Sequence, residues 1–228
     1  MNYKRMVPNS ISGLSLILGV VSIFLTIAHD FNWAAVFIIL AVLADSCDGR
    51  AARLLGVRGE FGKELDSLCD LCSFGVAPAI LIYVYGLQDL GVVGQVIAAL
   101  YTFGGAMRLA RFNVNAADVH GYFQGMPIPA GGCILATYVL SGYNYSSMWV
   151  AFGTLVVAYI MYSEIRYPDF KGKGNPLFLL PVAIAAAIGL YMLFTNTSAW
   201  PFICMFTYTI CGILNALYIK IFNKTISA

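Results

Sequence analysis

Residues 45–70 read DSCDGRAARLLGVRGEFGKELDSLCD, which places Asp45, Asp48, Asp66 and Asp70 between two strongly apolar runs. An ionisable side chain at the centre of a membrane helix costs roughly 2.5–3.5 kcal/mol on insertion scales. Four carboxylates in such surroundings must therefore face one another, water or a cation. This segment predicts where the chain crosses a membrane and where its chemistry lies.

The composition indicates the class of protein. Apolar residues make up 60% of the 228 residues and charged residues only 11%, whereas a soluble domain carries about a quarter charged residues. The sequence therefore predicts an all-α integral membrane protein, a helical bundle that forms a single domain over residues 1–228. The net charge is only +2, and nucleic acid is not expected as a partner.

The apolar runs divide into eight predicted spans. A spanning helix needs about 20 residues, so the second and third spans must continue into the aspartate segment. The fifth span is short. We place the eight near Ile11–Ala28, Trp33–Asp48, Leu65–Tyr85, Val92–Ala110, Ile128–Leu140, Met148–Tyr162, Leu177–Phe194 and Pro201–Ile221.

Charge is distributed unevenly across these eight spans. All thirteen lysines and arginines fall on one side of the predicted membrane, and the opposite loops carry only Asp30 and Asp89 as formal charges. Basic residues gather on the cytoplasmic face of a membrane protein. The pattern predicts a multi-pass protein of the cell membrane in which both termini and the aspartate segment face the cytoplasm.

The aspartates are spaced for two helix faces that can meet. Asp45 and Asp48 are three residues apart, and Asp66 and Asp70 are four apart, so each pair shares one face of a helix. Antiparallel packing of the two helices would bring all four carboxylates together. Two unit charges about 4 Å apart repel by about 4 kcal/mol at an effective dielectric of about 20. The cluster therefore needs protons or a metal, and oxygen ligands favour Mg²⁺, Mn²⁺ or Ca²⁺ over zinc.

Small residues and an arginine follow the first aspartate pair. Gly49 and Ala52 leave the helix surface bare, so a bulky ligand can approach the backbone, and Arg53 carries a planar fork suited to phosphate. Together with metal-binding carboxylates, this pattern favours a diphosphate substrate. Small residues alone would also fit a helix-packing face with interhelical salt bridges, but four aspartates would not.

The pattern D-x-x-D-G-x-x-A-R, eight residues, and then G-x-x-x-D-x-x-x-D resembles the signature of the CDP-alcohol phosphotransferase family at every fixed position of residues 45–70. The segment Pro8-Asn9-Ser10-Ile11-Ser12 is similar to the family's N-terminal P-N-x-I-[ST] segment, with serine where threonine is frequent. The resemblance implies transfer of a phosphoryl-linked group from a CDP-activated donor to an alcohol, with release of CMP. It also implies a homodimer.

The resemblance assigns roles to individual residues. Two divalent cations, Mg²⁺ or Mn²⁺ with Ca²⁺ as a further candidate, would be held by the four aspartates, and Asp70 would also be the catalytic general base. The CDP moiety would be held by Asn9, Ser12, Gly49, Arg53 and Gly59. Gly59 departs from some relatives, which place a hydroxyl side chain there.

Two later segments resemble the phosphatidylserine synthase branch of the family. Arg108-Leu-Ala-Arg111-Phe-Asn113 matches its R-L-A-R-F-N sequence, and a G-x-P-x-P sequence follows from Gly125 to Pro129. The arginine pair and Asn113 are candidates to bind the acceptor or a lipid phosphate, since arginine forms charge-assisted bonds to carboxylate and phosphate. Arginines at a cytoplasmic helix end also satisfy the positive-inside rule without binding anything.

The resemblance thus implies a metal-dependent CDP-diacylglycerol–serine O-phosphatidyltransferase. A CDP-activated lipid, CDP-diacylglycerol or CDP-archaeol, would react with L-serine to give phosphatidylserine or archaetidylserine and CMP, among membrane lipids. An enzyme of the same family that uses glycerol 3-phosphate or inositol phosphate as the acceptor is one alternative. A cation transporter is a more distant one, because intramembrane aspartates also mark ion pathways.

Overall fold

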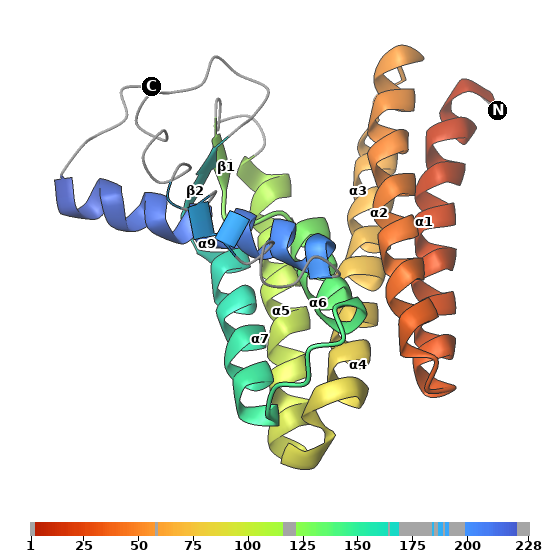
Figure 1. The fold of residues 1–228 in the computed structure, drawn as a ribbon. Helices are drawn as coiled ribbons and strands as arrows, with labels where there is room; N and C mark the ends of the chain where they lie inside the picture. The colour runs from red at the N-terminus through yellow and green to blue at the C-terminus, as the bar shows by residue number, and fades with distance from the viewer. Residues whose placement is uncertain are drawn as a thin grey trace.

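The computed structural model describes residues 3–57, 59–115, 122–163, 165–168 and 199–222, together with residues 184, 187–188 and 190–191. In this part of the chain the protein is helical apart from one short two-stranded ribbon. Three of the helices, α1, α2 and α3, lie side by side (Figure 1). They carry the aspartate segment.

The first two helices form an antiparallel hairpin. Helix α1 (Tyr3–Ile27) and helix α2 (Phe31–Leu54) are joined by a tight turn in which His29 has a positive φ of 60°. Asp30 begins α2 by accepting a bond from the Trp33 amide (3.4 Å) on its side chain, as acidic residues do at helix N-termini. The turn lies at the opposite end of the hairpin from the aspartates (Figure 1).

The third span is one continuous apolar helical rod of 31 residues, Glu60–Leu90, in which two turns have the wider π-helical geometry. Pro78 accounts for the first wide turn, because it has no N–H and its ring would clash with the Phe74 carbonyl four residues earlier. A wider π-type turn accommodates such a clash. In order, the rod comprises α3 (Glu60–Asp70), the π-helical turn η1 (Leu71–Val76), α4 (Ala77–Ile82), the second π-helical turn η2 (Tyr83–Leu87) and the 3₁₀ turn η3 (Gln88–Leu90).

The remaining elements complete the bundle on one side of this rod. The two strands pair antiparallel, with Phe123 opposite Tyr167, and α9 crosses the neighbouring helices instead of running along them (Figure 1). In chain order they are α5 (Val92–Asn115), β1 (Tyr122–Gln124), α6 (Ile128–Leu140), α7 (Ser147–Tyr162), β2 (Arg166–Pro168) and α9 (Trp200–Phe222).

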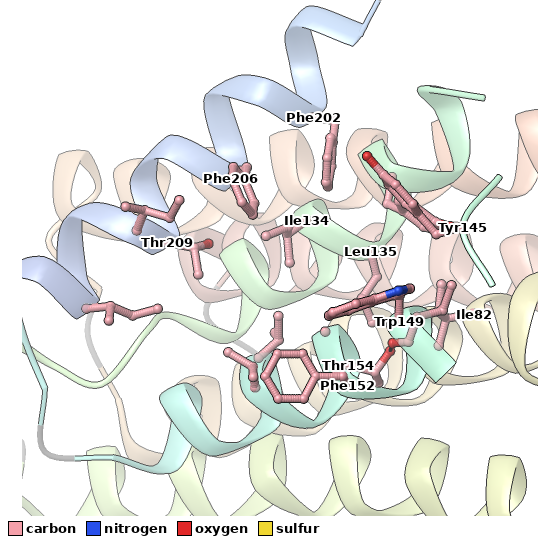
Figure 2. Close-up of a pocket in the computed structure, with 17 residues that line it drawn as sticks. Ile82, Ile134, Leu135, Tyr145, Trp149, Phe152, Thr154, Phe202, Phe206 and Thr209 are labelled. Carbon is pink, nitrogen blue, oxygen red and sulfur yellow. Dashed lines mark hydrogen bonds between the residues drawn. The ribbon is translucent and has the colours of Figure 1, made fainter. Parts of the chain in front are cut away.

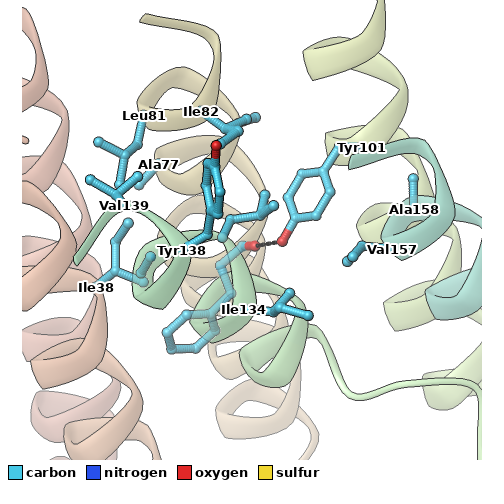
Figure 3. Packing of buried hydrophobic residues seen from close by; sticks show 14 of the residues in the cluster. Ile38, Ala77, Leu81, Ile82, Tyr101, Ile134, Tyr138, Val139, Val157 and Ala158 are labelled. Carbon is cyan, nitrogen blue, oxygen red and sulfur yellow. Dashed lines mark hydrogen bonds between the residues drawn. The ribbon is translucent and has the colours of Figure 1, made fainter. Parts of the chain in front are cut away.

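Side chains from α2, α4, α5, α6 and α7 form the buried core (Figure 3). Ile38, Leu81 and Tyr101 are fully buried there. Glycine allows the closest approach, since a Cβ on Gly104 would lie 2.9 Å from the Ala158 carbonyl oxygen. Small residues serve this purpose in membrane bundles.

Large apolar side chains also cover the outside of the bundle. Phe24, Phe103 and Trp149 are each 60–67% exposed on three different helices. A monomeric soluble protein rarely exposes apolar surface on this scale. Within the described residues, four helical stretches are long and apolar enough to cross a membrane: Met6–Ile27, Phe31–Ala51, Glu60–Leu90 and Val92–Val114.

The predicted spans agree with these helices in most places. The second and third spans continue into the aspartate segment as expected, and the short fifth span begins and ends where it was placed, at Ile128 and Leu140. The helices α6 and α7 are apolar but shorter than a full span, and within α9 the stretch Trp200–Asn215 is apolar. The predicted span Leu177–Phe194 lies largely outside the described residues. The all-α prediction missed only the β1–β2 ribbon, and the number of eight spans stays a prediction.

Candidate active site

The four aspartates converge between the second half of α2 and the second half of α3. Asp45 and Asp48 lie on α2, while Asp66 and Asp70 lie on α3. One carboxylate oxygen from each of Asp45, Asp48 and Asp66 lies within 4.8 Å of the others. The expected meeting of two helix faces is therefore present in the structure.

Asp70 completes the cluster from the next turn of α3. Its carboxyl group has those of Asp45, Asp66 and Asp48 as electrostatic neighbours. The Oδ1 atoms of Asp66 and Asp70 are buried and have no hydrogen-bond partner among the described residues. Buried acceptors without donors are rare in folded proteins. An oxygen-preferring divalent cation fits this set of ligands.

Ser12 fixes one of the carboxylates from α1. Its hydroxyl lies 2.6 Å from Asp48 Oδ2 and 3.2 Å from the Pro8 carbonyl oxygen, and both Ser12 and Asp48 are buried. A hydroxyl bound to one carboxylate oxygen restricts the side chain to one orientation and leaves the other oxygen available. Ser12 thus supports the metal ligands as well as lining the cavity described next.

A cavity of about 490 Å³ opens beside the cluster, between α1, α2 and the start of α3. A Cβ on Gly49 or Gly59 would meet nothing within 4 Å, so the backbone is open to a ligand at both glycines. Arg53 lies one turn beyond Gly49 on α2, and the structure describes its backbone only. The cavity is lined by Pro8, Asn9, Ser12, Asp48, Gly49, Val57, Gly59, Glu60, Gly62, Lys63 and Asp66.

Arg108 approaches the cluster from α5. It is only 7% exposed, and its electrostatic neighbours include Asp70 and Tyr208. Its Nε atom is buried without a hydrogen-bond partner in the described part of the chain. Because a buried guanidinium normally has several acceptors, Arg108 retains binding capacity next to Asp70.

Asn113 and Arg111 lie further along α5 and hold different partners. Asn113 donates from Nδ2 to Ser67 Oγ at 2.9 Å, which joins α5 to α3. Arg111 donates from Nη1 to the Tyr162 carbonyl oxygen (2.6 Å) and from Nη2 to the Ser163 carbonyl oxygen (2.9 Å). These bonds direct the Arg111 guanidinium to the end of α7, whereas the Arg108 guanidinium lies 5.9 Å from the centre of the Phe112 ring and has Asp70 as an electrostatic neighbour.

We predict that Arg111→Lys lowers the melting temperature of the purified protein by several degrees. A lysine cannot reproduce the two-nitrogen fork that holds the Tyr162 and Ser163 carbonyl groups, and a hydrogen bond from a charged group is worth about 1.5–3 kcal/mol. Thermal unfolding in detergent measures the effect. Arg50→Lys on the exposed end of α2 is the matched control, and equal melting temperatures for both variants would contradict the prediction.

Two contacts beside the signature were not predicted from the sequence. Lys63 donates from Nζ to the Asn113 carbonyl oxygen (2.8 Å), and Ser67 Oγ lies 3.1 Å from the Lys63 carbonyl oxygen. Lys63 and Ser67 each follow a fixed signature position, Gly62 and Asp66, and they are four residues apart on one helix face. That spacing was a signal that both side chains face a common neighbour.

A second cavity, of about 400 Å³, lies between α6, α7 and α9 (Figure 2). Its lining is aliphatic and aromatic, and it contains no charged side chain. The hydroxyls of Thr154 and Thr209 donate to carbonyl groups of their own helices, those of Val150 (2.8 Å) and Met205 (2.9 Å). This cavity offers nothing to a diphosphate, so the aspartate cluster is the candidate active site.

Several known proteins are similar to this chain in sequence over most of their length. The chain is 35% identical to a CDP-diacylglycerol–serine O-phosphatidyltransferase of Helicobacter pylori, over 97% of this chain and 96% of the relative. It is 37% identical to the Bacillus subtilis protein of the same name, over 75% and 93% of the two chains. It is 40% identical to an archaetidylserine synthase of Methanothermobacter thermautotrophicus, over 73% and 71%.

The matched region contains all the site residues described above. The sequence profile of the CDP-alcohol phosphatidyltransferase family matches residues 5–160, which span α1 through most of α7 and include the aspartates, the cavity and the end of α5. The chain therefore belongs to the CDP-alcohol phosphatidyltransferase family.

Proposed function

We propose that this protein transfers a phosphatidyl group from a CDP-activated lipid, CDP-diacylglycerol or CDP-archaeol, to the hydroxyl of L-serine. The products are phosphatidylserine or archaetidylserine and CMP. The proposal rests mainly on one observation: Asp45, Asp48 and Asp66 converge beside a polar cavity, with Asp70 and Arg108 as further members of the same electrostatic group. The names of the relatives, two CDP-diacylglycerol–serine O-phosphatidyltransferases and an archaetidylserine synthase, support serine as the acceptor.

The metal ligands are Asp45, Asp48, Asp66 and Asp70, and they hold two divalent cations, Mg²⁺ or Mn²⁺, with Ca²⁺ as a further candidate occupant. When bound, such ions neutralise the diphosphate and stabilise the charge that develops on it. The unpartnered Oδ1 atoms of Asp66 and Asp70 support this assignment, because a buried carboxylate oxygen needs either a donor or a cation.

The nucleotide part of the donor occupies the cavity between α1, α2 and α3. The bare backbone at Gly49 and Gly59 admits the diphosphate closely, and Asn9 and Ser12 line the same cavity. Arg53, one turn after Gly49, supplies a cationic fork for phosphate. These five residues form the proposed CDP-binding site.

Asp70 acts as the general base. It accepts the proton of the serine hydroxyl while that oxygen attacks the lipid-bearing phosphorus, and the bond from this phosphorus to the CMP oxygen breaks. The base role is supported by the electrostatic neighbours of this carboxyl, which are the other aspartates of the cluster and Arg108. A base within reach of the attacking hydroxyl can contribute about 10²–10⁴-fold to the rate.

Arg108, Arg111 and Asn113 form the proposed acceptor or lipid-phosphate site. Arg108 is the best supported of the three as a ligand-binding residue, because it is buried, has Asp70 as an electrostatic neighbour, and its Nε has no partner in the described region. A carboxylate or phosphate at this position would receive charge-assisted hydrogen bonds. Asn113 and Arg111 anchor the same end of α5 to α3 and α7.

The membrane arrangement completes the proposal. The chain forms a single membrane domain of about eight spans in the cell membrane, works as a homodimer, and has both termini and the active site on the cytoplasmic side. The positive-inside pattern supports this orientation. The turn between α1 and α2, which carries Asp30, and the turn before α5, which carries Asp89, lie at the same end of the bundle (Figure 1), and the lack of basic residues in both turns supports placing that end away from the cytoplasm.

The test is CMP release by the purified protein from CDP-diacylglycerol. We expect release with L-serine and Mg²⁺ or Mn²⁺, none with glycerol 3-phosphate or inositol phosphate, and loss of release on addition of EDTA. Release only with a phosphorylated acceptor would overturn the assignment of serine. Release that persists in EDTA after dialysis would overturn the assignment of the aspartates as metal ligands.

A further inference from the structure

The helix widens immediately after Asp70, the proposed base. The π-helical turn η1 covers Leu71–Val76, and π-type turns inside helices occur frequently at functional sites. In a regular α-helix the Phe74 carbonyl would accept a bond from the N–H of residue 78, but residue 78 is proline and has none. The turn therefore lacks one of its ordinary α-helical donors.

Tyr101 of α5 supplies a donor at this carbonyl. Its hydroxyl donates to the Phe74 carbonyl oxygen at 3.0 Å, and the Tyr101 side chain is fully buried. Figure 3 shows the bond as a dashed line from Tyr101 across the core. A buried tyrosine hydroxyl normally has a hydrogen-bond partner, and here the partner is a main-chain atom of the wide turn.

Two further hydroxyls hold the same turn. Thr102 Oγ1 lies 3.3 Å from the Gly75 carbonyl oxygen, next to the Tyr101 contact, and shares its one proton between that oxygen and the Ala98 carbonyl oxygen of its own helix, at 3.2 Å. From the other side, Ser73 Oγ donates to the Ser15 carbonyl oxygen at 2.9 Å, which ties the turn to α1. The turn is thus fixed between α5 and α1.

The wide turn sets the direction of the aspartates relative to the core. Each residue of an α-helix turns the chain by about 100°. One additional residue in a turn therefore rotates the side chains that precede the turn by about 100° relative to the side chains that follow it. Ala77 and Leu81, after the turn, are fully buried in the core, while Asp66 and Asp70, before it, meet α2. The wide turn lets Asp66 and Asp70 face α2 while Ala77 and Leu81 face the core.

We propose that Tyr101 is a positioning residue for the transfer reaction: by holding the Phe74 carbonyl it fixes the wide turn and so orients Asp70. This inference rests on the proposed function. Tyr101 and Arg108 are seven residues apart on α5, hence on one helix face. That face meets the segment from Asp70 to Phe74 at two points, where Arg108 has Asp70 as an electrostatic neighbour and the Tyr101 hydroxyl bonds to the Phe74 carbonyl.

The test is Tyr101→Phe, which removes only the hydroxyl. We expect kcat to fall about tenfold, the rate equivalent of one net hydrogen bond, while KM for CDP-diacylglycerol and for serine changes little. We also expect faster amide hydrogen exchange in residues 71–77 of the metal-free protein. Tyr83→Phe is the matched control, because Tyr83 opens the second wide turn and, among the described residues, its hydroxyl contacts only the exposed Gln95 side chain, at 3.2 Å.

The two readouts separate this inference from the proposed function. Unchanged exchange in residues 71–77 would overturn the positioning role even if no acceptor gave CMP release. Unchanged kcat with a lowered melting temperature would show that the hydroxyl serves stability alone, and would overturn it too. If Tyr101→Phe does not fold, Thr102→Val removes the neighbouring contact on Gly75, and the same pair of readouts decides.

Discussion

Asp70→Asn is expected to abolish turnover while leaving nucleotide binding largely intact. Asparagine has the size of aspartate but no basic carboxylate, so it cannot accept the proton of the serine hydroxyl. The residues proposed to hold CDP lie elsewhere, around the cavity that Asn9, Ser12 and Gly49 line. Asp70 itself does not line that cavity. The substitution therefore separates chemistry from nucleotide binding.

The measurement is CMP release alongside equilibrium binding of a CDP-lipid in Mg²⁺ or Mn²⁺. A loss of about 10²–10⁴-fold in kcat is typical of a missing general base, and loss of a metal ligand would add to it. Asp89→Asn, at an exposed aspartate on the opposite end of the bundle, controls for the loss of a carboxylate. Turnover near the normal level in Asp70→Asn would remove the base role from this residue.

Local spacing explains why so much of the site was predictable. The separations of three and four residues within the aspartate pairs put each pair on one helix face, and the short turn between α2 and α3 allows those faces to meet. Helix α6 begins directly after Pro127 and ends just before Gly142, where φ is 67°. Such features depend on neighbours in the chain, and the sequence displays them directly.

Contacts between distant segments were not predictable in this way. Arg111 is three residues from Arg108, which made a common pocket plausible, yet its guanidinium bonds to carbonyl groups 51 and 52 residues away at the end of α7. Main-chain acceptors leave no mark in side-chain patterns. The wide turn after Asp70 had one signal, Pro78, but whether proline kinks a helix or widens it depends on partners such as Tyr101, which the fold supplies.

Asp66→Asn is expected to act in opposite directions on activity and on stability. Its carboxylate lies within 4.8 Å of those of Asp45 and Asp48, and its Oδ1 is buried without a hydrogen-bond partner in the described chain. Asparagine removes one member of a repelling cluster, so the metal-free variant should unfold at a higher temperature than the wild-type protein. It also removes a metal ligand, so CMP release should fall by at least about 100-fold, as expected when metal stabilisation of several kcal/mol is lost.

Thermal unfolding at pH 8, with EDTA and then with Mn²⁺, tests both halves of this expectation. A ligand that binds the folded state at 100 times its Kd stabilises it by about 2.7 kcal/mol, so Mn²⁺ should raise the melting temperature of the wild-type protein and of Asp89→Asn. It should raise that of Asp66→Asn much less. A metal-free Asp66→Asn that melts below the wild-type protein would mean that the carboxylate makes a stabilising contact there. Active sites often lower the stability of an enzyme. If metal-free Asp66→Asn melts at a higher temperature than the metal-free wild-type protein, the fold holds the four aspartates together against their mutual repulsion.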